Sequence, residues 1–191
     1  MYQNVIFDLD GTLLNTLEDL KDSTNYALAQ HSYPTRTLEE VRCFVGNGIR
    51  KLIDRAVPEG TSVEKTDKVF ATFREYYATH SRVKTSMYEG MEQVMDALKE
   101  QNISMAIVSN KADDAVKDLA KYYFAKYIDV AIGEREGISR KPAPDSVYEA
   151  MRLLGATKEN TVYVGDSDVD RATAKNAGIP CISVTWGFRS E

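Results

Sequence analysis

Five short apolar segments constrain the fold of this chain more than any other feature of its sequence. They are rich in β-branched residues and apolar at successive positions, so both faces of each segment are hydrophobic. Strands of a parallel sheet that is covered on both faces have this pattern. The segments are Val5-Ile6-Phe7 and residues 103–108, 128–132, 161–164 and 181–184.

Amphipathic stretches of helix length separate the later apolar segments. In the first of these stretches we expect Val94, Met95 and Leu98 to face inward. The alternation of strand and helix predicts right-handed βαβ units, and therefore an α/β fold with a parallel sheet between two layers of helices. The stretches are residues 91–101, 114–124, 145–154 and 168–177.

A long insertion after the first apolar segment breaks this alternation. It contains only helical signals, including two sequences typical of a capping box, Thr16-x-x-Asp19 and Thr37-x-x-Glu40. An insertion of this length exceeds a normal strand-to-helix connection. We therefore expect a separate helical cap that acts as a lid over the sheet. The predicted division is a core of residues 1–15 and 87–191 and a cap of residues 16–86.

The composition limits the possible partners. The 191 residues include 24 Lys and Arg against 29 Asp and Glu, and the net charge of -5 argues against a nucleic-acid-binding surface. Cys43 and Cys181 lack the spacing of a paired motif, which predicts free thiols in the cytoplasm. No signal peptide or apolar run of membrane-spanning length is apparent, so we expect no membrane partner. Both a monomer and a homodimer remain open.

The first apolar segment ends in two acids, Asp8 and Asp10, followed by Gly11. The period of a strand directs both carboxylates to the same side, and Gly11 allows a sharp turn. Two close carboxylates repel each other unless a cation intervenes, which favours a hard metal such as Mg²⁺. Taken alone, this motif is also compatible with a solvated acidic turn.

Three other segments end in polar residues that could complete a site. Each has a structural alternative: Ser109 and Asn110 could form a turn or helix cap, Lys141 could lie in a surface loop, and an Asp or Ser often caps a helix. Because parallel strands end at the same edge of a sheet, we expect all of them to converge there. They are Ser109 and Asn110, Lys141 within Arg140-Lys141-Pro142-Ala143-Pro144, and Asp166, Asp168 and Asp170 around Ser167.

This set of residues predicts phosphoryl-transfer chemistry. Asp8 can attack phosphorus to form an aspartyl-phosphate, and Asp10 can protonate the leaving oxygen and then activate water. We expect Ser109 and Lys141 to be catalytic as well, because the transferred group needs donors for its oxygens. The predicted phosphate-binding set is Asp8, Gly11, Ser109, Asn110 and Lys141.

In order along the chain, these motifs resemble those of the haloacid-dehalogenase-like superfamily of phosphohydrolases. The matching residues are Asp8-Leu9-Asp10-Gly11-Thr12, Ser109, Lys141 and Gly165-Asp166-Ser167-x-x-Asp170. The resemblance implies a Rossmann-like core with an inserted α-helical cap. It also implies Mg²⁺ bound by Asp8, Asp166 and the main-chain carbonyl of Asp10, with Asp170 supporting either the metal or Lys141.

The segment from Val45 to Arg50 resembles the phosphoglycolate phosphatase branch. This implies a small phosphorylated metabolite as substrate, with Asn47 or Arg50 meeting its polar end, although the same residues could form a solvated turn. A phosphomutase or a non-catalytic phosphate-binding module remains an alternative, whereas Asp10 disfavours a dehalogenase. Relatives usually continue beyond the residues that end at Glu191, so we expect a truncated sequence or the lack of that closing segment.

Overall fold

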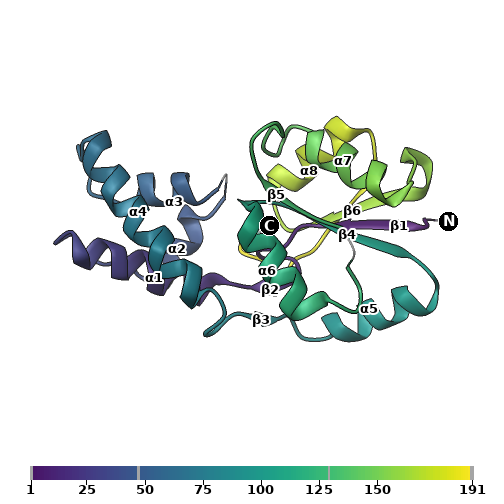
Figure 1. Ribbon diagram of the computed structural model, residues 1–191, viewed down its shortest axis with the longest axis horizontal. Helices are drawn as coiled ribbons and strands as arrows, with labels where there is room; N and C mark the ends of the chain where they lie inside the picture. Colours follow the sequence, from purple (N-terminus) through teal and green to yellow (C-terminus); the bar gives the residue numbers. More distant parts are fainter. Residues whose placement is uncertain (1, 47, 129, 190–191) are drawn as a thin grey trace. The chain divides into compact units, whose positions relative to one another are not determined.

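The computed structural model describes residues 2–46, 48–128 and 130–189 (Figure 1). The chain forms two compact units. One unit combines Met1–Asn15 with Met87–Glu191, and the other is Thr16–Ser86. We refer to them as the core and the cap.

A five-stranded parallel sheet forms the centre of the core. Its strands are β1 (Asn4–Phe7), β4 (Ser104–Ala112), β5 (Val130–Glu134), β6 (Thr161–Gly165) and β7 (Cys181–Ser183). Their order is β5-β4-β1-β6-β7, so β1 lies in the middle. The predicted α/β fold with a parallel sheet is confirmed; residue 129, within one predicted strand, lies outside the described residues. The chain order reverses on either side of β1, and ligands bind beyond the strand ends at such a point.

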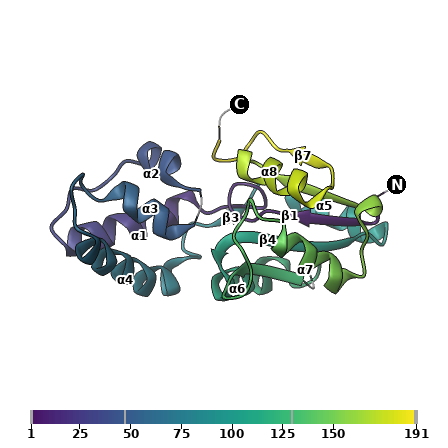
Figure 2. The ribbon, with the colours of Figure 1, turned by 90° about the horizontal axis from the view of Figure 1, so that it is seen from above.

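Helices cover both faces of this sheet (Figures 1 and 2). Along β1, Val5 and Phe7 belong to one hydrophobic cluster and Ile6 to the other, as the alternation of side chains along a strand requires. The first cluster includes α5 (Met91–Glu100) and α6 (Asp113–Phe124), and the second includes α7 (Asp145–Leu154) and α8 (Asp168–Ala177). A short 3₁₀ helix, Lys158–Asn160, precedes β6.

The inward face of α5 differs from the prediction at one position. Val94 is 47% exposed, whereas Met91 and Met95 are buried and Leu98 packs partly against them. The helix begins at Met91, and residues four and three apart share one face of a helix. The inward face therefore runs through Met91, Met95 and Leu98, and Val94 lies beside it.

In its described residues the cap contains four helices: α1 (Leu17–Gln30), α2 (Leu38–Phe44), α3 (Ile49–Ala56) and α4 (Val63–His80). Leu20 and Leu28 of α1 and Val69 and Phe73 of α4 are buried. Where the chain leaves and re-enters the core, β2 (Leu14–Asn15) and β3 (Ser86–Met87) form a two-stranded sheet. None of the helices in the described residues is both long and apolar enough to cross a membrane.

One predicted capping box forms and the other does not. Thr37 and Glu40 make both reciprocal hydrogen bonds at the start of α2. The prediction for Thr16 and Asp19 is wrong, because Thr16 makes no side-chain cap hydrogen bond in α1. The carboxylate of Asp19 instead accepts hydrogen bonds from a distant segment of the cap.

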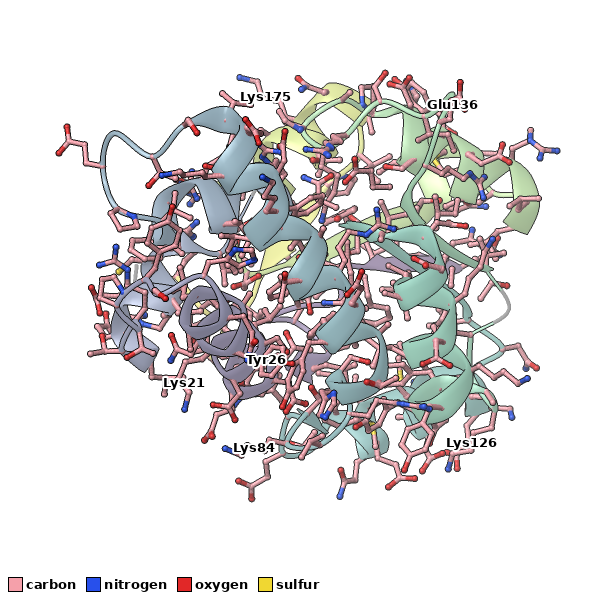
Figure 3. All side chains as sticks on the ribbon, turned by 60° about the vertical axis from the view of Figure 1, so that its left-hand side comes forward. Lys21, Tyr26, Lys84, Lys126, Glu136 and Lys175 are labelled. Carbon is pink, nitrogen blue, oxygen red and sulfur yellow. The ribbon has the colours of Figure 1, made fainter. Side chains whose placement is uncertain are left out.

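Asp19 connects the start of α1 to the end of the cap sequence. Its carboxylate accepts from the backbone N–H groups of Lys84, at 2.9 and 3.0 Å, and of Thr85, at 2.8 Å. The Thr85 hydroxyl also donates to it at 2.8 Å. Lys84, labelled in Figure 3, directs its ammonium group to Asp22 instead. Asp19 therefore closes the cap by satisfying backbone donors 65 and 66 residues away.

We predict that Asp19→Ala lowers the free energy of unfolding by about 3 kcal/mol, because it leaves buried N–H and O–H donors without their acceptor. Asp22→Ala is the matched control, since it removes an ion pair on a partly exposed side chain and should lower that free energy by less than about 1 kcal/mol. Urea denaturation followed by circular dichroism measures both. Equal losses in the two variants would contradict the role of Asp19.

Candidate active site

The turn after β1 carries the two predicted acids. The backbone N–H of Asp8 donates to Val164 at 2.9 Å and so extends the pairing of β1 with β6. The chain then turns at Gly11, whose φ of 86° is left-handed. A Cβ atom at Gly11 would also lie 2.5 Å from a carboxylate oxygen of Asp166. Glycine is required here for both reasons, and it allows the β1 turn to approach Asp166.

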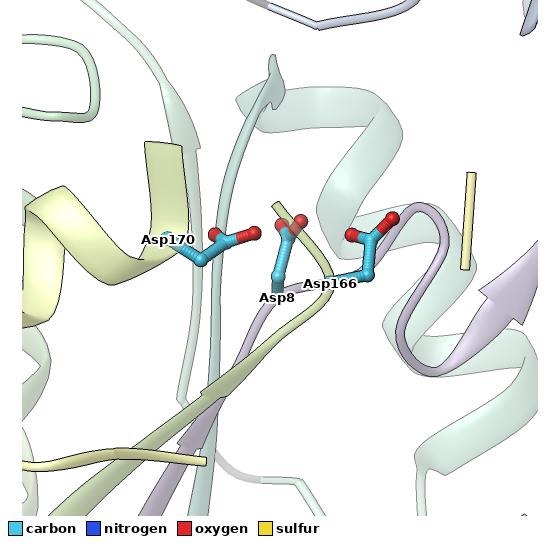
Figure 4. Close-up of side chains that lie close together, drawn as sticks. All are labelled: Asp8, Asp166 and Asp170. Carbon is cyan, nitrogen blue, oxygen red and sulfur yellow. The ribbon is translucent and has the colours of Figure 1, made fainter. Parts of the chain in front are cut away.

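Three carboxylates meet at this edge of the sheet (Figure 4). Asp8, Asp166 and Asp170 each offer an oxygen atom, and these atoms lie within 4.8 Å of one another. They come from the end of β1, the residue after β6 and the first turn of α8. The structure thus brings together residues that are more than 150 positions apart in the sequence.

Lys141 lies among these carboxylates. Its ammonium group contacts Asp8 at 2.8 Å and Asp170 at 2.7 Å, and it donates to the Tyr163 hydroxyl at 3.0 Å. The side chain of Lys141 is only 3% exposed. Asn110 holds its backbone, because the Asn110 amide accepts from Lys141 N–H at 2.8 Å and donates to the Lys141 carbonyl at 3.0 Å. Asn110, predicted to bind phosphate, thus positions the lysine.

Lys141 shifts the pKa values of its two carboxylate partners to different extents. Burial opposes charge on Asp170, but Lys141 outweighs it and holds the pKa of Asp170 below its usual value. Burial also opposes charge on Lys141, but Asp170 and Asp8 raise its pKa well above the usual value. Burial and the nearby charge of Asp170 raise the pKa of Asp8 to about 8, despite its contact with Lys141. One ammonium group lies between two buried carboxylates, so a further cation near Asp8 would favour its ionised form.

Asp166 is held at the edge of the site by the segment near the end of the chain. Phe188 N–H donates to one of its oxygens at 2.8 Å, while burial raises its pKa. A Cβ atom at Gly187 would lie 2.3 Å from Asp166, as one at Gly11 would lie 2.5 Å away. Two glycines therefore leave room for this carboxylate beside Asp8.

Asp170 is engaged on both oxygens. One accepts from Lys141 and, at 3.1 Å, from Tyr163; the other accepts from Ser167, through its N–H at 3.0 Å and its hydroxyl at 2.5 Å. Ser167 and Asp170 also form the capping box of α8. The start of α8 therefore orients the acid that faces Lys141.

The carboxylate of Asp10 has a different partner. Both of its oxygens contact the ammonium group of Lys111, at 2.8 and 2.9 Å, and the lysine side chain is 2% exposed. Ser109 is buried two residues earlier, and its hydroxyl oxygen accepts from Lys111 N–H at 3.2 Å. Lys111 was not among the residues predicted for the site, although the sequence places it directly after Ser109 and Asn110.

Known proteins match this arrangement over most of the chain. The profile of the haloacid dehalogenase-like hydrolases matches residues 5–184. Phosphoglycolate phosphatase 1 of Pseudomonas aeruginosa is 34% identical over 190 residues, which cover 96% of this chain and 70% of that protein. The chain belongs to the haloacid dehalogenase-like hydrolase family. The predicted resemblance is confirmed.

Two further relatives show how far the likeness extends. The crystal structure of a "putative phosphoglycolate phosphatase" from Lactobacillus delbrueckii subsp. bulgaricus has a TM-score of 0.93 and 35% identity, covering 99% of this chain and 88% of that chain. A "putative pyrophosphatase PpaX" of Caldanaerobacter subterraneus is 31% identical over 183 residues, covering 95% of this chain and 81% of that protein. Hydrolases of this family with similar identity to the chain thus carry different substrate names.

A break in the regular pairing of β4 explains how this hydrolase positions Ser109 and Lys111. The prediction that the second strand ends at Val108 is wrong, because β4 continues to Ala112. Its register with β5 shifts between Val108 and Ala112, and such bulges redirect side chains near active sites. Ser109 therefore lies within an irregular strand end and not at the start of α6.

Gly133 of β5 allows this irregular segment to approach. A Cβ atom there would lie 2.5 Å from the Cα of Asp113 and 2.6 Å from the carbonyl oxygen of Lys111. The N–H of Gly133 donates to the Asp113 carboxylate at 2.9 Å. These contacts are with backbone and cannot be relieved by moving a side chain.

We predict that Gly133→Ala lowers the free energy of unfolding of this hydrolase by about 3 kcal/mol, because the added methyl group forces β5 and the β4 bulge apart. Gly137→Ala is the control. Its Cβ would meet nothing within 4 Å, but its φ of 83° is left-handed, so the loss should be about 1 kcal/mol. Thermal and urea denaturation of both variants test this difference. A smaller loss at Gly133 than at Gly137 would contradict it.

The cap residues predicted to contact substrate have structural partners where they can be described. Residue 47 lies outside the described residues. Arg50 donates to Asp54 at 2.8 Å and also pairs with Asp67, both within the cap. Arg55, which was not predicted, donates to the Phe44 carbonyl at 2.7 Å. Through these contacts the two arginines link α3 of this hydrolase to α4 and to the end of α2.

Proposed function

We propose that the chain is a Mg²⁺-dependent phosphatase that hydrolyses small phosphomonoesters through an aspartyl-phosphate on Asp8. The observation that carries this proposal is the position of Asp8 at the tip of β1, 2.8 Å from Lys141 and close to Asp166. The phosphatases named among the relatives support the same reaction class. Both cysteines are free, in agreement with the proposed cytoplasmic location.

The residues of the site fit Mg²⁺. Carboxylate and carbonyl oxygens are the ligands this ion prefers, and the buried acids carry more charge than Lys141 can compensate. We assign the metal to Asp8, Asp166 and the main-chain carbonyl of Asp10. Asp170 supports Lys141, because Lys141 and Ser167 already engage its two oxygens. When bound, Mg²⁺ supplies positive charge that keeps Asp8 ionised and offsets the charge of the phosphoryl group.

The first step forms a bond between a carboxylate oxygen of Asp8 and phosphorus and breaks the bond from phosphorus to the leaving oxygen. Asp10 donates a proton to that oxygen, so that the alcohol leaves neutral. Ser109 and Lys141 hold the other phosphoryl oxygens, with the backbone at Gly11 beside them. Their charge and hydrogen bonds stabilise the transition state without taking part in covalent chemistry.

The second step returns the enzyme to its first state. Asp10, now a carboxylate, accepts a proton from water while the water oxygen attacks phosphorus. The bond from phosphorus to Asp8 breaks, inorganic phosphate leaves, and Asp10 is again protonated. The same residue thus acts first as an acid and then as a base. Because Asp10 activates the water, the aspartyl-phosphate is hydrolysed and does not accumulate.

The proposed substrate is a small acidic phosphomonoester such as phosphoglycolate. The names of two relatives support this choice, and the pyrophosphatase name of a third defines the competing substrate to be tested. The proposed partner is thus a small phosphorylated metabolite. Either a monomer or a homodimer is compatible with a site built from one chain.

The test is release of inorganic phosphate from a panel of phosphomonoesters and pyrophosphate, with Mg²⁺ or with excess chelator. We predict activity that requires Mg²⁺ and that falls at least about 10³-fold in Asp8→Asn, a loss of about 4 kcal/mol of transition-state stabilisation. Asp168→Asn removes a nearby exposed carboxylate and should retain activity.

Three results would contradict the proposal. Full activity in excess chelator would show that the reaction does not require a metal. Normal turnover by Asp8→Asn would show that Asp8 is not the nucleophile. Transfer of the phosphoryl group to a second substrate position, without release of inorganic phosphate, would identify a phosphomutase.

A role of Arg50 in substrate choice remains a prediction. Arg50→Ala should raise KM for phosphoglycolate by roughly 10-fold, which is about 1.4 kcal/mol, and leave KM for an uncharged aryl phosphate unchanged. Asp54→Asn is the matched control, because it removes one ion-pair partner of Arg50 but leaves the positive charge of Arg50 in place. Equal changes for both substrates would assign Arg50 to the stability of the cap.

A further inference from the structure

Lys111 is a second buried cation of the site that the reaction described above does not use. Its ammonium group contacts both oxygens of Asp10, at 2.8 and 2.9 Å, and its side chain is 2% exposed. The bulge of β4 and the close approach of Gly133 fix the backbone that carries it. A lysine is rarely buried this deeply without a compensating carboxylate, so the pair forms a built element of the site.

Lys111 changes the net charge of the site. Four carboxylates, those of Asp8, Asp10, Asp166 and Asp170, face two ammonium groups, those of Lys111 and Lys141. In the site without substrate, where Asp10 is a carboxylate paired with Lys111, the six charged groups leave an excess of two negative charges, which one divalent cation compensates. Asp10 takes up the proton that it donates in the reaction when the substrate binds. Without Lys111 three negative charges would remain, and a site with one bound divalent cation would repel a phosphoryl dianion.

The contact with Lys111 also determines what Asp10 can bind. Carboxylate oxygens are preferred ligands of divalent cations, and Asp10 lies two residues from Asp8. Both of its oxygens are instead directed to the ammonium group of Lys111. The lysine thereby holds the side chain of Asp10 away from metal coordination and leaves the metal to the other acids.

We propose that Lys111 is a positioning residue that limits the site to one weakly held divalent cation and so preserves its affinity for a phosphoryl dianion. This inference rests on the proposed function. It predicts opposite effects of removing the charge of Lys111: tighter binding of the metal and weaker binding of phosphate. A merely structural lysine would weaken both, because its loss would distort the whole site.

The experiment measures binding by isothermal titration calorimetry, first of Mg²⁺ alone and then of inorganic phosphate in saturating Mg²⁺. Lys111→Met should bind Mg²⁺ roughly 10-fold more tightly and phosphate roughly 10-fold more weakly than the wild type, as expected for one nearby charge. Lys121→Met removes an exposed lysine of α6 and should change neither affinity by more than about 2-fold.

A double variant, Asp10→Asn with Lys111→Met, separates charge from folding. It removes both members of the pair, so the excess of two negative charges returns. Its affinity for Mg²⁺ should therefore lie within about 3-fold of the wild type. Circular dichroism and thermal denaturation establish that each variant is folded, and Lys111→Arg, which keeps the charge, should bind Mg²⁺ as the wild type does.

The outcomes separate this inference from the proposed function. If the wild type binds Mg²⁺ and releases phosphate but folded Lys111→Met binds Mg²⁺ no more tightly, the role of Lys111 is overturned and the proposed function stands. If the double variant keeps the tighter metal binding of Lys111→Met, the charge argument is overturned. If the wild type binds no Mg²⁺ and releases no phosphate, both proposals fall.

Discussion

The arrangement of the site depends on the contacts of one ammonium group, that of Lys141, with two carboxylates. It contacts Asp8 at 2.8 Å and Asp170 at 2.7 Å in a place that water scarcely reaches. Burial and the nearby charge of Asp170 raise the pKa of Asp8 to about 8, whereas Lys141 holds the pKa of Asp170 below its usual value. Asp8, the proposed nucleophile, is therefore held where a further cation would favour its ionised form.

The backbone of the sheet and the start of α8 hold Asp8, Lys141 and Asp170 in place. Asp8 extends β1 beside β6, Asn110 holds the backbone of Lys141, and the first turn of α8 orients Asp170. These elements meet because parallel strands end at one edge, and β1 lies between β4 and β6. No part of this support lies in an exposed side chain, so the positions of the charges follow from the fold itself.

The sequence predicts the parts of the structure that depend on periodicity. Buried strands and amphipathic helices follow from their apolar patterns. Because parallel strands end at the same edge of a sheet, the positions of Asp8 and Asp166 directly after two such strands predict that they lie close together. The role of Lys111 could not be predicted, because the bulge that redirects it depends on pairing with β5 and on the absence of a side chain at Gly133. The capping box at Thr16 failed for a similar reason: backbone donors 65 residues away provide a stronger set of partners for Asp19 than the local turn does.

A stability requirement alone does not explain this concentration of charge. Replacing a buried ion pair by well-packed apolar residues is often neutral or stabilising, whereas separating its members is strongly destabilising. Here two lysines and four acids occupy one edge of the sheet, and Gly11 and Gly187 leave room beside Asp166. The pair of Asp10 and Lys111 is itself neutral, so the excess of two negative charges comes from Asp8, Asp166, Asp170 and Lys141. In the proposed function one divalent cation compensates that excess, so that the occupied site does not repel an anionic substrate.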